Sequence, residues 1–96
     1  MKNTKMNSYQ KMQQLAIVAK NLVKLHQINR VKIVYKLVEK AWESGNDEMR
    51  NAITNGFLYG LTTWIDAQYP REREFIRILP PCLKQEYEKQ IYSHGI

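Results

Sequence analysis

Cys82, His26 and His94 are the side chains of this 96-residue chain that could act as a nucleophile or bind a transition metal. Metal sites need several such ligands at set spacings, and these three residues are isolated, so we expect no metal. Cys82 follows two prolines at the predicted start of a helix, where the helix dipole can lower a thiol pKa. We favour the alternative that it is a small apolar core residue. His94 is a poor base for this thiol, because the intervening helix separates them by about 18 Å.

The acidic residues offer no pair for acid–base catalysis. Asp47 and Glu48 fall in the first turn of a predicted helix, where negative charge stabilises the helix N-terminus. Asp66 is expected to form a salt bridge with one of the arginines that follow it, Arg71, Arg73 or Arg77. The chain has no glycine-rich phosphate loop, nucleophile elbow or zinc-protease motif. We therefore expect a protein that is not an enzyme, with no catalytic residue and no cofactor.

A strip of small residues and a high tyrosine content favour binding instead. Ala52, Gly56 and Gly60 lie four apart on one predicted helix, and each glycine costs that helix about 1 kcal/mol relative to alanine. Close approach of another helix would offset this cost, and a groove for a ligand or peptide is the functional alternative. Tyrosines at positions 9, 59, 69 and 92 fit the apolar stripes poorly and could mark an interface. The predicted partner-binding residues are Gly56, Gly60, Tyr59 and Tyr92.

Positive charge is concentrated in the first part of the chain. The net charge is +6, and no acidic residue precedes Glu39. Such a segment could attract nucleic acid or another anion, or could only keep a helical surface solvated. Lysine outnumbers arginine in it, which weakens the case for specific phosphate recognition. The candidate anion-binding residues are Lys20, Lys24, Arg30, Lys32 and Lys36.

Apolar periodicity predicts helices throughout the chain. Residues 1–7 lack any pattern and are expected to form a flexible tail, and residues 8–96 a single domain. A helix that begins with Ser8 as its N-cap carries one apolar stripe, formed by Leu15, Val18, Leu22 and Leu25. A second stripe is out of phase with the first and contains Ile28, Val31, Tyr35, Val38 and Trp42, widened by Val34 and Leu37. We therefore expect a break between His26 and Asn29, although the absence of glycine and proline leaves a protruding helical arm as the alternative.

Capping residues delimit the other predicted helices. Gly45 is expected to end the second helix, and Asn46 or Asp47 to cap a third helix that runs to about Ala67. Residues 71–79 are expected to form a loop with one or two helical turns. The last helix begins at Pro81 and carries Leu83, Tyr87 and Ile91 on one face, with Gly95 and Ile96 closing it in a Schellman motif. The aromatic residues expected in the core are Tyr35, Trp42, Phe57 and Trp64.

Composition agrees with one compact all-α domain of four main helices and a possible short extra helix before the last. Apolar residues make up 44% of the chain, enough for a single core. No apolar run approaches the length of a bilayer span, and the first 14 residues lack the apolar region of a secretory signal. A single cysteine cannot form an internal disulfide, which is typical of a cytoplasmic protein.

Two stretches of the sequence resemble an uncharacterised family of small bacterial helical proteins. One runs from Tyr35 to Asp66, and the other is the C-terminal segment LPPCLKQEYEKQIYSHGI. The residues that match the family pattern are Gly45, Asn46, Asn51, Ala52, Ile53, Asn55, Phe57, Tyr59, Leu79, Pro80, Leu83, Tyr87 and Gln90. The resemblance covers about two thirds of the chain. It leaves the basic N-terminal helix outside and implies an all-α fold with no established activity.

Three hypotheses follow from the sequence. The first is a non-enzymatic protein–protein interaction domain that uses its helix faces to bind a partner chain or a second copy of itself. The second is a nucleic-acid or anion-binding module that uses the basic segment. The third is thiol chemistry at Cys82.

Overall fold

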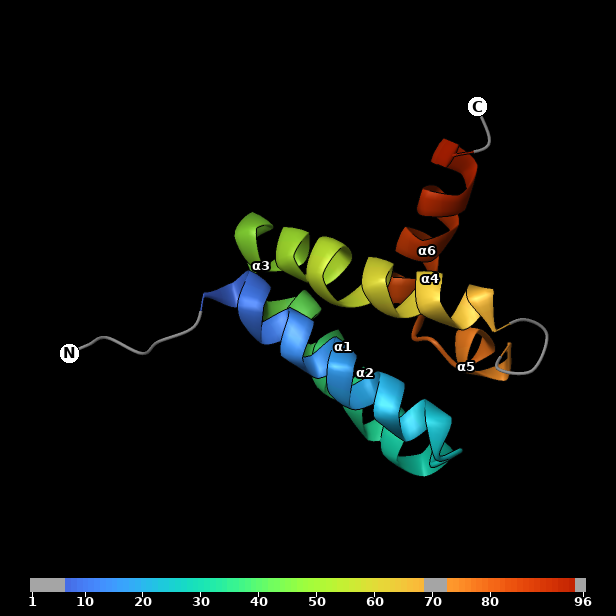
Figure 1. Cartoon of the computed structure of the whole chain (residues 1–96). Coiled ribbons are helices and arrows are strands. Elements are labelled where there is room, and N and C mark those ends of the chain that lie inside the picture. The colour runs from blue at the N-terminus through green and yellow to red at the C-terminus, as the bar shows by residue number, and fades with distance from the viewer. Residues whose placement is uncertain (1–6, 69–72, 95–96) are drawn as a thin grey trace.

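The structure is a computed structural model that describes residues 7–68 and 73–94, with the backbone alone described for 92–94. In these residues it contains helices and no strand. They are α1 (Ser8–Lys24), α2 (Ile28–Ser44), α3 (Asp47–Ala52), the π-helix η1 (Ile53–Leu58), α4 (Tyr59–Ala67), α5 (Glu74–Arg77) and α6 (Pro81–His94). Because α3, η1 and α4 follow one another without a break, they form one rod (Figure 1). The predicted fold of four main helices and a short extra one is confirmed.

A tight turn folds α2 back alongside α1 (Figure 1). His26 adopts the left-handed conformation, with φ of 56°. The amide of His26 donates to the carbonyl of Val23 at 2.9 Å, and that of Gln27 to Leu22 at 2.9 Å. This is the hydrogen-bond pattern of a Schellman motif, with histidine in the place that glycine usually takes. The predicted break is therefore confirmed, and α1 and α2 do not form a protruding arm.

Local caps define the ends of the other helices. Asn7, not Ser8, caps α1: its side chain accepts from the amide of Gln10 at 2.8 Å, and the Gln10 side chain accepts from the amide of Asn7. Asn46 caps α3 by accepting from the amide of Met49 at 2.9 Å, as predicted. Gly45 is the C-cap of α2, and Pro81 is the first residue of α6. The remainder of the predicted tail, Tyr69 and the motif predicted at Gly95 and Ile96 lie outside the described residues.

The face of α1 that is buried differs from the predicted face. Val18 and Leu25 are 46% and 67% exposed, and Leu15 and Leu22 only flank the core. The buried residues of α1 are Met12, Ala16, Ala19 and Val23. α1 packs against both the rod and α2, and small side chains let it approach the rod closely. The stripe of α1 that contains Ala16 and Ala19 is therefore buried, because it allows α1 to lie close to the rod.

Most of the other core predictions are confirmed. Tyr35 and Phe57 are buried with their rings edge to face, and Trp42 and Trp64 pack against the core from its margin. Val31, Val34 and Val38 complete the buried face of α2. Leu37 and Ile91 are more than 40% exposed, so each lies beyond the edge of its predicted stripe. No helix in the described part of the chain is both long and apolar enough to cross a bilayer.

Candidate binding groove

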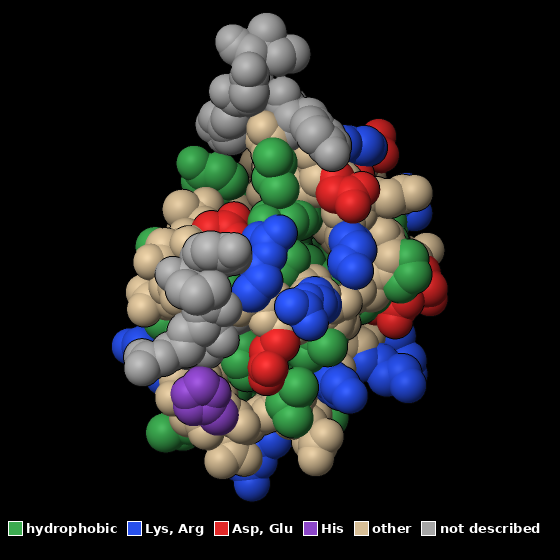
Figure 2. Space-filling model, turned by 90° about the vertical axis from the view of Figure 1, so that its right-hand side faces the viewer, with side chains coloured by type: hydrophobic (Ala, Val, Ile, Leu, Met, Phe, Trp, Pro, Cys, Tyr) green, Lys and Arg blue, Asp and Glu red, His purple; other side chains and the backbone are tan. Residues whose placement is uncertain are grey.

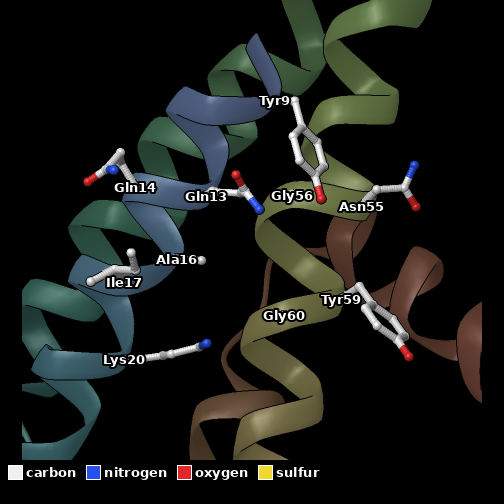
Figure 3. Close-up of a pocket in the computed structure, with 10 residues that line it drawn as sticks. All are labelled: Tyr9, Gln13, Gln14, Ala16, Ile17, Lys20, Asn55, Gly56, Tyr59 and Gly60. Atoms are coloured by element: carbon white, nitrogen blue, oxygen red, sulfur yellow. The ribbon is translucent and has the colours of Figure 1, made fainter. Parts of the chain in front are cut away.

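A groove of about 430 Å³ lies between α1 and the η1–α4 part of the rod (Figure 3). Its size falls within the range of about 300–1,000 Å³ that is usual for ligand pockets. It is lined by Tyr9, Gln13, Gln14, Ala16, Ile17 and Lys20 from α1, and by Asn55, Gly56, Tyr59 and Gly60 from η1 and α4. Three of the four predicted partner-binding residues, Gly56, Gly60 and Tyr59, therefore come together. The side chain of Tyr92, the fourth, lies outside the described residues.

The two glycines of the groove have different surroundings. A Cβ atom on Gly56 would lie 3.0 Å from the carbonyl oxygen of Tyr9 and 3.1 Å from the Cβ of Met12. At Gly56 α1 and the rod thus approach closely, as the small-residue strip predicted. A Cβ atom on Gly60 would meet no atom within 4 Å. A methyl group at position 56 would therefore have to displace its neighbours by a few tenths of an ångström, whereas one at position 60 would displace no described atom.

We expect Gly56→Ala and Gly60→Ala to change stability in opposite directions. Alanine at position 60 should raise the free energy of unfolding by about 0.5–1 kcal/mol, because it removes the helix penalty of glycine. Alanine at position 56 gains the same propensity but must push α1 away, so we expect a net loss of about 1 kcal/mol. Urea unfolding followed by far-UV circular dichroism measures both values. Equal changes in the free energy of unfolding for the two variants would contradict the difference in packing between positions 56 and 60.

The walls of the groove carry polar side chains that have no partner in the described chain. Gln13 and Lys20 extend from α1 toward the facing rod, and Tyr9 lies over Gly56 (Figure 3). No hydrogen bond or ion pair joins the side chains of Gln13, Lys20 or Asn55 to another described residue. Tyr9 and Tyr59 are 44% and 46% exposed. In Figure 3 the side chains of Asn55 and Tyr59 point away from α1, so the groups that face the groove without a described partner are the carboxamide of Gln13 and the ammonium of Lys20.

The π-helix η1 forms part of the wall and supplies Asn55 and Gly56. π-helical turns are rare, and they are frequent at functional sites. Periodicity at 3.6 residues per turn predicted a continuous α-helix here and missed this segment. On α1, the four-residue step from Tyr9 to Gln13, beside the buried stripe, is the pattern that could have indicated the wall.

The candidate anion-binding residues do not form one site. Lys20 lines the groove, and the ammonium of Lys24 lies 5.9 Å from the ring centre of Trp64 on α4. Lys32 and Lys36 line a separate hollow of about 260 Å³ together with the acidic Glu39 and with Pro80 and Pro81. Arg30 is exposed on α2. Figure 2 shows lysine and arginine side chains interspersed with acidic and apolar ones over one face of the molecule.

Cys82 lies partly buried beside the core, as its apolar surroundings predicted. Burial is the largest cause that raises the pKa of its thiol, and the negative charges of Glu39 and Glu43 raise it further. Hydrogen bonds from backbone amides at the start of α6 lower the pKa of Cys82, but they lower it by less than burial and the two carboxylates raise it. The thiolate fraction at neutral pH is therefore reduced, which disfavours thiol chemistry.

Alkylation of Cys82 by iodoacetamide at pH 7.5 should be at least about tenfold slower in the folded protein than in the urea-unfolded chain. The reason is the raised thiol pKa together with partial burial. Mass spectrometry of timed samples gives both rates, with free cysteine in the same two buffers as the control for the effect of urea. Faster labelling of the folded protein would restore the thiol hypothesis.

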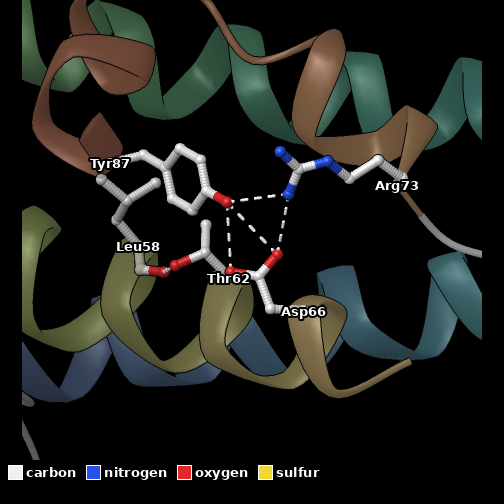
Figure 4. A network of polar contacts seen from close by, with 5 residues as sticks. All are labelled: Leu58, Thr62, Asp66, Arg73 and Tyr87. Atoms are coloured by element: carbon white, nitrogen blue, oxygen red, sulfur yellow. Dashed lines mark hydrogen bonds and ion pairs between the residues drawn. The ribbon is translucent and has the colours of Figure 1, made fainter. Parts of the chain in front are cut away.

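A polar cluster joins α4, the residue before α5, and α6 (Figure 4). Arg73 Nη1 donates to Asp66 Oδ1 at 3.1 Å and to the Tyr87 hydroxyl at 3.0 Å, and that hydroxyl donates to Asp66. The predicted salt bridge of Asp66 is thus confirmed. Burial is the main cause that raises the pKa of Tyr87. These bonds connect three separate segments of the chain, so we interpret the cluster as a structural link between helices rather than a catalytic site.

Among the described residues, no three side chains of histidine, cysteine, aspartate or glutamate converge to hold a metal ion. In comparisons with known proteins, one family model matches residues 2–93 of the chain, and its description is "Domain of unknown function". The match includes the basic N-terminal helix, which the sequence resemblance had left outside. No curated protein matches the chain. No solved structure matches it either.

Proposed function

The chain belongs to the family Domain of unknown function (DUF7674), and we propose that it is a non-enzymatic protein–protein interaction domain. We place the binding site in the groove between α1 and the η1–α4 part of the rod. The partner is a segment of another protein, and the domain works in the cytoplasm without cofactor or metal.

The observation that supports this proposal most directly is the glycine at position 60, inside a helix. A glycine inside a helix costs about 1 kcal/mol relative to alanine, and Gly56 offsets that cost by admitting α1. Gly60 lines the same groove with no atom of the described chain near the position of its missing Cβ. Close approach of a partner would offset this cost. The exposed tyrosines and the carboxamides without partners around it are groups typical of protein interfaces.

Gly60→Leu is the test, because a Cβ atom at this position meets no described atom within 4 Å and the rest of the leucine side chain would occupy space in the groove. Displayed random peptides about 12 residues long are selected on the full chain, and the affinities of enriched peptides are measured by fluorescence anisotropy. We expect micromolar binders that Gly60→Leu weakens at least about tenfold. The matched control is Asn21→Leu, on an exposed position of α1 that does not line the groove. A selection without binders, or binders that tolerate Gly60→Leu, would contradict the proposal.

Anion or nucleic-acid binding is the second candidate, and it is supported by Lys32 and Lys36, which line one hollow although Glu39 lines it too. Charge-driven binding falls steeply as salt rises, because counterion release loses its advantage. We expect an anion-binding protein to be retained on heparin at about 50 mM salt and released by about 200 mM. The double variant Lys32→Gln/Lys36→Gln should not be retained. Both results together would support this candidate. The absence of retention at low salt would exclude it.

A further inference from the structure

We infer that the outer face of the α1–α2 hairpin binds an amphipathic helix of a partner protein, whose apolar stripe has acidic side chains at both ends. This face lies on the side of the two helices away from the rod (Figure 1). It is separate from the groove, so this function goes beyond the one proposed above and does not depend on it.

Four large aliphatic side chains of the hairpin are exposed. Val18 on α1 and Leu25 at its end are 46% and 67% exposed, and Ile33 and Leu37 on α2 are 60% and 55% exposed. Val18 and Leu25 belong to the stripe that the sequence predicted for the core, and no described helix covers them (Figure 1). α1 therefore has two apolar stripes, and the rest of the described chain buries only one of them.

The four side chains share one surface because of how the two helices are placed. The groove lies along one flank of α1, and the hollow of about 260 Å³ lies along one flank of α2. Since α1 and α2 are antiparallel neighbours, their opposite flanks face each other. At about 100° per residue, Val18 and Leu25 fall on the solvent side of α1 toward this seam. Leu37 has the same position on α2, and Ile33 precedes it by one turn. Adjacent exposed apolar side chains of this kind are typical of an interaction site.

The charged residues that border this face are basic. Lys11, Arg30 and Lys40 are exposed, and none of their side chains forms a hydrogen bond or ion pair with a described residue. α1 contains no acidic residue, and the acidic residues of α2, Glu39 and Glu43, lie on the flank toward α6. Carboxylates on a partner would therefore gain ion pairs at this border and meet no like charge there.

The aliphatic centre favours a helix over an extended segment. An extended chain that covered it would bury backbone N–H and C=O groups without partners. A helix satisfies these groups internally, and it can pack along the seam of two others as helices do in bundles. Arg30 and Lys40 are ten residues apart on α2, which corresponds to about 15 Å. Acidic residues about three turns apart on the partner helix match both ends of the face.

Two other occupants match this face less well. A second copy of the chain would bring one basic border against another, and like charges across an interface cost affinity. A lipid surface would attract the basic residues, but the exposed centre of the face contains no Trp, Tyr or Phe. These aromatic residues are the ones enriched at membrane interfaces.

A displayed library with a randomised face on a rigid helix of about four turns is selected on the full chain. We expect binders whose apolar stripe has Asp or Glu at both ends. Val18→Ser and Leu37→Ser should each weaken them at least about tenfold. Ile17→Ser is the matched control for Val18→Ser, because Ile17 is the neighbouring residue, is 50% exposed and lines the groove instead.

Charge reversal tests the acidic ends of the partner helix. Arg30→Glu should weaken the binders at least about fivefold, and a lysine in place of the acidic residue that faces it should restore binding to this variant only. Lys32→Glu is the matched control, because Lys32 is exposed on the same helix and lines the hollow on its other flank. Binders that tolerate both Arg30→Glu and Lys40→Glu would overturn the inference.

Other results would overturn it as well. A selection without binders, or binders that tolerate Leu37→Ser, would show that the face is not a docking site for a helix. Self-association in sedimentation velocity that Leu37→Ser abolishes would make a second copy the occupant. Vesicles with phosphatidylserine that bind the wild type and not Leu37→Ser would make it a lipid surface. Gly60→Leu should leave the binders unaffected, since binders weakened by it would lie in the groove. Urea unfolding of each variant shows whether a loss of binding reflects a loss of fold.

Discussion

Gly45→Ala is expected to lower the free energy of unfolding by about 2–3 kcal/mol, the largest effect of any single-methyl addition that we predict for this chain. The added Cβ would lie 2.5 Å from the carbonyl oxygen of Ala41, in the last part of α2. It would also lie 2.7 Å from the Cγ of Met49, in α3. The carbonyl belongs to the backbone at the end of the same helix, so the last turn of α2 must distort to relieve this contact, and the Met49 side chain must move as well. Urea unfolding followed by tryptophan fluorescence gives the change.

The cause is crowding and not backbone strain. Gly45 has φ of −88° and ψ of 157°, which any residue can adopt. Gly60→Ala is the matched control, because it adds the same methyl group where no described atom lies within 4 Å. If Gly45→Ala costs less than about 0.5 kcal/mol, the junction between α2 and α3 is looser than these distances imply.

Gly45 also shows why helix ends were predictable from the sequence. A helix end depends on a few neighbouring residues, because caps satisfy backbone groups within one turn. Gly45, Asn46 and Pro81 were therefore placed correctly. The N-cap of α1 was missed by one residue, because asparagine and serine are about equally favoured as N-caps and Asn7 directly precedes Ser8. At the α1–α2 turn the position of the break was predicted, but the left-handed histidine that makes it was not.

The buried face of α1 could not be predicted in the same way. Its sequence offers two apolar stripes, one of large residues and one that includes Ala16 and Ala19. Burial of large side chains alone would favour the first stripe. The second was selected because Gly56 of the rod lets α1 approach, which is a contact between segments far apart in the sequence. Periodicity within one helix contains no information on such a partner.

The binding groove was predictable only in part for the same reason. Gly56, Gly60 and Tyr59 were identified because small residues and an unplaced tyrosine are visible in one helix. Gln13, Asn55 and the grouping of Lys20 with them depend on how α1 crosses the rod. The π-helix that supplies Asn55 leaves no distinctive composition. Its position was therefore known only from the structure.

Tyr35→Phe is expected to destabilise the protein by about 1–3 kcal/mol at neutral pH. The buried hydroxyl of Tyr35 donates to the carbonyl oxygen of Phe75 at 2.8 Å and so ties α2 to α5. Phenylalanine keeps the edge-to-face contact with Phe57 but leaves that carbonyl without its partner. Urea unfolding at pH 7 measures the loss. Tyr9→Phe is the control, because it removes an exposed hydroxyl and should change stability by no more than about 0.5 kcal/mol.

The same substitution should also change how stability responds to alkaline pH. Burial raises the pKa of the Tyr35 phenol well above its ordinary value. Above pH of about 10 the unfolded chain loses this proton while the folded protein keeps it, so the stability of the wild-type protein falls as pH rises. One such proton contributes a decrease of at most about 1.4 kcal/mol per pH unit. Stability below that pH is unaffected by this ionisation.

Tyr35→Phe removes this contribution, so its loss of stability between pH 9 and about 11.5 should be smaller than that of the wild type by about 1–2 kcal/mol. Tyr87, whose pKa burial also raises, is present in both proteins. The difference between the two pH profiles therefore isolates Tyr35. Parallel profiles would mean that the Tyr35 hydroxyl ionises as readily in the folded protein as in the unfolded chain. That result would contradict the burial of the Tyr35 hydroxyl between α2 and α5.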